Sequence, residues 1–166
     1  LDVATAFLQS KIDPRFEIFV EFPEGFLLEG CKYGQLFKSL YGLKQAARDW
    51  FTMSEQFILG FDSRFEKSPC EPCMYFLRCK EVSIFVLVHV DDYIIAHNND
   101  KFYDSFVAGF RKHFSINDLG DAEHVLQISI KWKKTAEGLA QVELSQNRQI
   151  LAAVKQYGLE HSRPYF

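Results

Sequence analysis

Apolar residues dominate between residues 74 and 97, in β-branched and aromatic runs that predict β-strands. MYFLRCKEVSIFVLVHV (74–90) is rich in β-branched and aromatic residues and has a charged turn at Lys80-Glu81. The second of these strands continues into Asp91-Asp92, and YIIAH (93–97) follows as another strand. We therefore expect a hairpin with two aspartates at its tip.

Three segments show a helical period instead. In 100–114 the phenylalanines recur every four residues, after an Asn98-Asn99-Asp100 cap, and such a stripe is typical of core packing. A helix is predicted from about Ala46 to Leu59, and another over 145–158 with Ser145 as cap and Gly158 as C-terminal glycine. The apolar side of the helix near 46–59 is Ala47, Trp50, Phe51, Ser54, Phe57, Ile58 and Phe61.

The remaining segments complete an α+β outline. FEIFVEF (16–22) predicts a strand that stops at Pro23-Glu24-Gly25, and 124–134 with 140–144 predict a hairpin across TAEG (135–138). Asp2 stands at the end of a strand, in an N-cap-like position before a short helix. The fold class expected is α+β, a mostly antiparallel sheet with helices packed on one face.

Composition narrows the class of protein. With 166 residues, 48% hydrophobic and 25% charged, the chain is typical of one globular domain. A net charge of −3 is not the basic signature of a nucleic-acid binder, so any contact with a polyanion must be local. No apolar run approaches the ~18 residues of a membrane span. Leu1 begins no signal peptide and is not Met, so we expect a fragment that lacks an upstream part.

The four cysteines favour a structural role. Cys70 and Cys73 form a C-x-x-C, which is half of a zinc site, but neither a second pair nor a His-x₃₋₅-His completes it. Reduced, partly buried thiols in an intracellular protein are the favoured interpretation for these two and for Cys31 and Cys79.

The acidic pair at the hairpin tip is the candidate chemistry. Two carboxylates about 4 Å apart repel by about 4 kcal/mol at an effective dielectric near 20. Aspartate also favours turns, and Asp2 has an N-cap as its ordinary role. If Asp2 joins Asp91 and Asp92 on one edge, three carboxylates would suit Mg²⁺, and two such ions promote phosphoryl displacement.

Six segments in a fixed order then point to a known family: LDVATAFLQ, EIFVEFPEGF, LFKSLYGLKQAARDWF, SPCEPCMYF, VLVHVDDYIIA and VELSQNRQILAAVKQYGL. Together they resemble the reverse transcriptase of copia-type retrotransposons over nearly the whole chain. The resemblance implies a polymerase palm-like fold for a single domain, 1–166, with part of the fingers and the start of the thumb near 145–166.

The resemblance also implies roles for individual residues. Asp2, Asp91 and Asp92 match the catalytic, metal-binding aspartates. Asp2 and Asp91 match direct ligands of two Mg²⁺ ions, for which Mn²⁺ can substitute, and Asp92 matches the second aspartate of the tip, which is essential but less directly a ligand. Phe7 matches the bulky residue under the sugar of the incoming nucleotide, where it excludes a ribose 2′-OH. The segment beside template and nucleotide is matched by Tyr41, Gly42, Lys44, Gln45 and Arg48. Contact with phosphates and a role as solvated charges at the start of the helix are both open for Lys44 and Arg48.

Two departures from the family pattern matter. The tip has His89 where an aromatic residue is usual, and we expect His89 either to point into the core of the sheet or to support the aspartates from beside them. The basic fingers residues that grip the triphosphate are absent, so the chain alone is not expected to polymerise efficiently.

The implied function is RNA-directed DNA polymerisation in retrotransposon replication. The implied partners are deoxynucleoside triphosphates, a primer on an RNA or DNA template, and the rest of a polyprotein, with no membrane. The expected location is intracellular, in a cytoplasmic retroelement particle or in the nucleus. The alternative is a degenerate, non-catalytic palm-like module that binds nucleic acid or protein.

Overall fold

A computed structural model describes residues 1–26, 30–135, 138 and 140–163. The chain divides into two compact units, Leu1–Asp118 and Leu119–Phe166. Helices and antiparallel strands occur together, which confirms the predicted α+β class. In the described ranges, no helix has the length and apolar character needed to cross a membrane.

The first unit is built on a six-stranded sheet in the order β4-β5-β6-β7-β1-β8. Every pair of neighbours in it is antiparallel. The predicted strands of 74–97 are therefore confirmed, and the additional strands are only two residues long. The bounds are β4 Glu66–Lys67, β5 Met74–Arg78, β6 Ser83–His89, β7 Asp92–His97, β1 Asp2–Val3 and β8 Ile116–Asn117.

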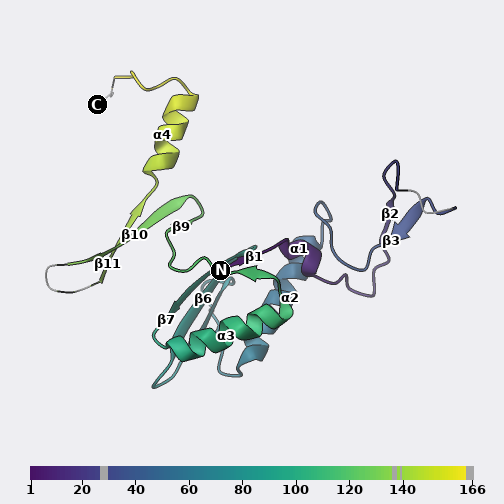
Figure 1. Ribbon diagram of the computed structural model, residues 1–166, viewed down its shortest axis with the longest axis horizontal. Helices are drawn as coiled ribbons and strands as arrows, with labels where there is room; N and C mark the ends of the chain where they lie inside the picture. Colours follow the sequence, from purple (N-terminus) through teal and green to yellow (C-terminus); the bar gives the residue numbers. More distant parts are fainter. Residues whose placement is uncertain (27–29, 136–137, 139, 164–166) are drawn as a thin grey trace. The chain divides into compact units, whose positions relative to one another are not determined.

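Two long helices, α2 (Ala46–Phe61) and α3 (Asp100–His113), pack on the sheet (Figure 1). The side chain of Asn99 accepts a hydrogen bond from the amide of Phe102 at 3.0 Å, which confirms the predicted cap of α3. The phenylalanine stripe lies in the core as predicted. Ala47 is exposed, because α2 buries Ala46, Trp50, Ser54 and Ile58 instead.

A separate two-stranded sheet pairs β2 (Phe19–Glu21) with β3 (Tyr33–Gln35). The predicted strand of 16–22 is thus only three residues long. The turn predicted at Pro23-Glu24-Gly25 is present, since the amide of Phe26 donates to the carbonyl of Pro23 at 3.1 Å.

The second unit contains the strands β9 (His124–Val125), β10 (Ile128–Lys134) and β11 (Ala140–Ser145) and the helix α4 (Asn147–Gln156). Pairing of β10 with β11 confirms the predicted hairpin, although 136–137 of its TAEG turn lie outside the described residues. The helix starts one residue later than predicted, with Gln146 rather than Ser145 as N-cap. Its C-terminal Gly158 has φ 65°, as a C-terminal glycine should.

A turn at Leu126-Gln127 was not expected from the sequence. Both residues have positive φ, 46° and 67°, and they join β9 to β10. Positive φ at both central residues is the pattern of a type I′ hairpin turn, which normally has asparagine and glycine there. Neither Leu126 nor Gln127 belongs to those types, so the turn is strained.

Replacing Gln127 by glycine is therefore expected to stabilise the second unit by about 1 kcal/mol, because glycine removes the left-handed penalty. Thermal melting of the variant measures this. The control is Gln141→Gly in β11, where glycine weakens a strand and should lower the melting temperature. A lower melting temperature for both variants would show that Gln127 is not strained.

Candidate functional site

The fold brings the three aspartates of the predicted site together. Asp2 is the direct cross-strand partner of Asp92, and the amide of Val3 donates to the carbonyl of Asp91 at 2.9 Å. Asp91 lies in the two-residue turn between β6 and β7, whereas Asp92 begins β7. Residues separated by about ninety positions in the sequence are thus adjacent in the sheet.

Burial shows which face of the sheet carries the aspartates. Val3 and Tyr93 are buried on the face that the helices cover. Because neighbouring residues in a strand point to opposite faces, Asp2 and Asp92 lie on the other face. Directly paired residues have Cβ atoms about 5 Å apart. Two carboxylates therefore stand side by side on the face that α2 and α3 leave open.

The side chains fit a hard divalent cation by chemistry. All three are carboxylates, and none is fully buried. Asn117 is the β8 residue paired with Asp2, and its side-chain amide donates a hydrogen bond to the Asp2 carboxylate at 3.2 Å. Within the part of the chain that the structure describes, however, no three His, Cys, Asp or Glu side chains converge as a metal site. The backbone brings the three aspartates next to one another, and their side chains do not all point to one position.

The tip of the hairpin is strained and is held from α2. Val90, the first residue of the turn, has φ 56°, a conformation in which a β-branched residue is rare. The indole N–H of Trp50 donates to the Val90 carbonyl at 2.5 Å. One helical turn further, the hydroxyl groups of Ser54 and Tyr93 are hydrogen-bonded at 2.5 Å, and burial raises the pKa of the Tyr93 phenol.

Two predictions about the edge of this site are wrong. His89 is exposed and is not a core histidine, because the buried residues of β6 are Ile84, Val86 and Val88 and alternation puts His89 on the open face. It is the cross-strand partner of Asp92, so a supporting role beside the aspartates stays a prediction. Asp2 is not an N-cap: it lies inside β1, and Thr5 precedes the short helix α1 (Ala6–Gln9) without a side-chain cap bond.

The residues predicted to meet the nucleotide lie partly together. The half-buried ring of Phe7, on α1, packs against the exposed ring of Tyr41 with centroids 5.2 Å apart and planes at 56°. Gly42 follows with φ 93°, a conformation that favours glycine, and the space where a Cβ would stand is open. The Phe7–Tyr41 pair thus lies next to a glycine in the sequence, at which no side chain blocks approach to the backbone.

A chain of hydrogen bonds through buried serines joins this aromatic pair to α2. The Ser10 hydroxyl donates to the Phe7 carbonyl at 2.8 Å, and the Ser10 carbonyl accepts from the amide of Ser39 at 3.0 Å. The Ser39 hydroxyl in turn donates to the carboxylate of Asp49 at 3.0 Å. Because Ser10 and Ser39 are fully buried, these bonds fix α1 to the start of α2.

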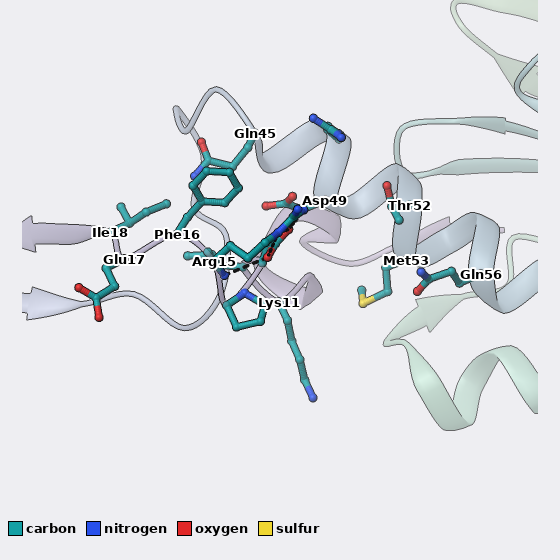
Figure 2. Close-up of a pocket in the computed structure, with 14 residues that line it drawn as sticks. Lys11, Arg15, Phe16, Glu17, Ile18, Gln45, Asp49, Thr52, Met53 and Gln56 are labelled. Carbon is teal, nitrogen blue, oxygen red and sulfur yellow. Dashed lines mark hydrogen bonds and ion pairs between the residues drawn. The ribbon is translucent and has the colours of Figure 1, made fainter.

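The basic candidates lie at the start of α2. Lys44 and Arg48 are exposed, and Gln45 is the N-cap of the helix. Gln45 and Arg48 also line an open hollow of about 1200 Å³ between α2 and residues 11–18 (Figure 2). None of the three aspartates lines this hollow, so it is separate from the carboxylate edge.

The hollow is lined by three basic and three acidic residues, and one pair of them is joined: Lys11, Arg15, Arg48, Asp13, Glu17 and Asp49. The guanidinium of Arg15 binds the carboxylate of Asp13 at 2.5 Å and lowers the Asp13 pKa to about 2. Because basic and acidic residues are equal in number there, the hollow has no strong preference for an anion. We therefore place the candidate functional site at the three aspartates.

The cysteines do not form a second site. Cys31, Cys70 and Cys79 are free and exposed, and Cys73 is half-buried. The expectation of partly buried thiols is therefore correct only for Cys73. The described residues also give no zinc cluster that would complete Cys70 and Cys73.

Comparison with known proteins identifies the family. A family model described as "Reverse transcriptase (RNA-dependent DNA polymerase)" matches residues 1–165. The chain is 34% identical over 167 residues to the "Retrovirus-related Pol polyprotein from transposon TNT 1-94" of Nicotiana tabacum, covering 99% of this chain and 12% of the relative. No solved structure matches the chain.

Two further relatives are also transposon proteins. The "Retrovirus-related Pol polyprotein from transposon RE1" of Arabidopsis thaliana is 29% identical over 169 residues, covering 99% of this chain and 11% of the relative. A "Putative transposon Ty5-1 protein" of Saccharomyces cerevisiae is 34% identical over 134 residues, with 78% and 42% covered.

The chain therefore belongs to the reverse transcriptase (RNA-dependent DNA polymerase) family. Its matches to Pol polyproteins of plant transposons confirm the copia-type resemblance seen in YGLKQAAR and the V-D-D tip. The chain spans 12% and 11% of the length of the two plant polyproteins that it matches.

The sequence did not reveal two residues of this site. Trp50 was expected only as a core residue of α2, and the apolar period that predicted it carries no sign of its hydrogen bond to the tip. Asn117 lies in a two-residue strand, which is too short to show any periodicity.

Proposed function

We propose that this chain is the palm-like part of a polymerase that adds deoxynucleotides to a primer on an RNA or DNA template. In this reaction the primer 3′-oxygen bonds to the α-phosphorus of the nucleotide and pyrophosphate leaves. The observation that supports the proposal most strongly is the direct pairing of Asp2 with Asp92 beside the Asp91 turn.

Asp2 and Asp91 would hold two Mg²⁺ ions, or Mn²⁺, with Asp92 adding negative charge beside them. The ions, when bound, would lower the pKa of the primer hydroxyl and neutralise charge on the phosphates. The protein's contribution is to keep the carboxylates on one edge of a rigid sheet, partly open to water. The hydrogen bond from Asn117 orients the Asp2 carboxylate in advance.

The aromatic pair and the start of α2 would receive the nucleotide and the template. Phe7, supported by Tyr41, would lie under the sugar and leave no room for a 2′-hydroxyl group. The bare backbone at Gly42 allows close approach of a base or sugar, and Gln45 lies close by. Lys44 and Arg48 are exposed and suited to phosphate contacts.

Partners and location follow from the same proposal. The partners would be the primer on its template, deoxynucleoside triphosphates and the rest of the polyprotein. The reaction would take place inside the cell, in a cytoplasmic particle or in the nucleus.

A second candidate function is binding without catalysis. The observation that favours it is that the described His, Cys, Asp and Glu side chains form no ready metal site. A degenerate palm-like module would bind nucleic acid or protein through its exposed aromatic and basic residues.

Single-nucleotide extension of a DNA primer on an RNA template distinguishes the two. The protein should be made from the whole reading frame that contains these residues, with Mg²⁺ present. We expect extension that stops when the metal is chelated. Binding of the primer–template by a folded protein that extends no primer would favour the non-catalytic module.

A further inference from the structure

The turn that carries Asp91 is an unfavourable conformation for its own sequence. A two-residue hairpin turn with positive φ at its first residue normally has glycine there, but Val90 occupies the position with φ 56°. A β-branched residue in this conformation remains only when surrounding contacts hold it. Those contacts therefore determine where Asp91 and Asp92 lie.

Besides the backbone bonds to β1, side chains of α2 hold the turn on both sides of the aspartates. Before them, the Trp50 indole N–H donates to the Val90 carbonyl at 2.5 Å. After them, the Tyr93 hydroxyl is hydrogen-bonded to that of Ser54 at 2.5 Å. Trp50, Ser54 and Tyr93 are each at most 2% exposed, so water does not compete for these bonds.

The hydrogen bond of Trp50 is separable from its packing. Its ring packs edge-on against Phe114 with centroids 5.2 Å apart, and a phenylalanine would keep most of that contact. What phenylalanine lacks is the N–H that reaches the turn. A residue needed only for the core would not have to be tryptophan.

We propose that Trp50 is a positioning residue for nucleotide addition, which rests on the proposed polymerase function. Its indole N–H holds the strained Val90 turn and thereby fixes Asp91 and Asp92 relative to Asp2. The Ser54–Tyr93 pair fixes the start of β7 in the same way. Helix α2 therefore holds the tip on both sides.

The test is Trp50→Phe in the protein made from the whole reading frame. We expect hydrogen exchange of peptides spanning the turn, and of the Val3 amide bonded to Asp91, to accelerate about tenfold. The rate of nucleotide addition at saturating nucleotide should fall about tenfold or more, because small displacements of reacting groups are costly. The KM for the nucleotide should change less than twofold, since Phe7 and Tyr41 are untouched.

The matched control is Phe114→Leu, which disturbs the same packing but removes no bond to the turn. Exchange at the turn and nucleotide addition should then stay within twofold of the unaltered protein. If Trp50→Phe does not fold, the double variant Ser54→Ala/Tyr93→Phe removes the second anchor without leaving an unpaired hydroxyl group, and exchange at the turn should again accelerate.

Unchanged exchange at the turn in a folded Trp50→Phe protein would overturn the proposal, as would an equal loss of activity in Phe114→Leu. Absence of extension by the unaltered protein would count against the polymerase function instead. Hydrogen exchange would even then show whether Trp50 holds the turn.

Discussion

Replacing Asp91 by asparagine is expected to lower the rate of primer extension about a thousandfold or more while leaving the fold intact. The substitution keeps size and shape but removes the negative charge that the proposed metal site requires. A loss of about 4 kcal/mol in transition-state stabilisation corresponds to three orders of magnitude. Single-turnover extension by the protein from the whole reading frame measures the loss.

The matched control is Asp104→Asn, an identical change at an exposed position of α3. It should leave extension within twofold of the unaltered protein. If Asp91→Asn kept a tenth or more of the rate, Asp91 would not be a ligand of the reacting ions.

The second large effect concerns stability. Phe110 is fully buried on α3, and its ring contacts Phe57, Tyr93, Phe106 and Phe114. Phe110→Ala should therefore lower the free energy of unfolding of the first unit by about 3–5 kcal/mol through lost contacts and a cavity. Phe102→Ala, at the half-buried end of the same stripe, should cost less than half as much.

Tryptophan fluorescence during urea unfolding can report on the first unit alone. Trp50 is buried in that unit, whereas Trp132 is exposed in the other, so the measurement is best made in a Trp132→Phe background. Because the chain has two units, a signal from only one of them avoids mixing two transitions. Equal losses for Phe110→Ala and Phe102→Ala would contradict the packing described above.

Much of the first unit could be predicted from sequence because its long elements carry a clear period. The four-residue spacing of phenylalanine in 100–114 predicted α3, and the β-branched, aromatic run in 83–89 predicted β6. Because residues 84–88 are all apolar, the sequence did not show which of them face the core. The structure shows that Ile84, Val86 and Val88 point inward, so His89 points outward.

The parts that could not be predicted depend on contacts between distant residues. β1 and β8 are two residues long and form only because they pair within the sheet, so no local sequence pattern predicts them. The turn at Leu126-Gln127 has neither glycine nor asparagine, which are the usual signals. The adjacency of Asp2 to Asp91 and Asp92 likewise depends on the pairing of β1 with β7, which no local sequence pattern encodes.

Counting bound Mn²⁺ tests the central claim most directly. Electron paramagnetic resonance of free Mn²⁺ should be recorded with the unaltered protein, with Asp2→Asn, with Asp91→Asn and with Asp104→Asn. We predict that each of the first two variants binds fewer Mn²⁺ ions per chain than the unaltered protein, while Asp104→Asn binds the same number. Equal Mn²⁺ binding by all four proteins would contradict the assignment of these aspartates as metal ligands.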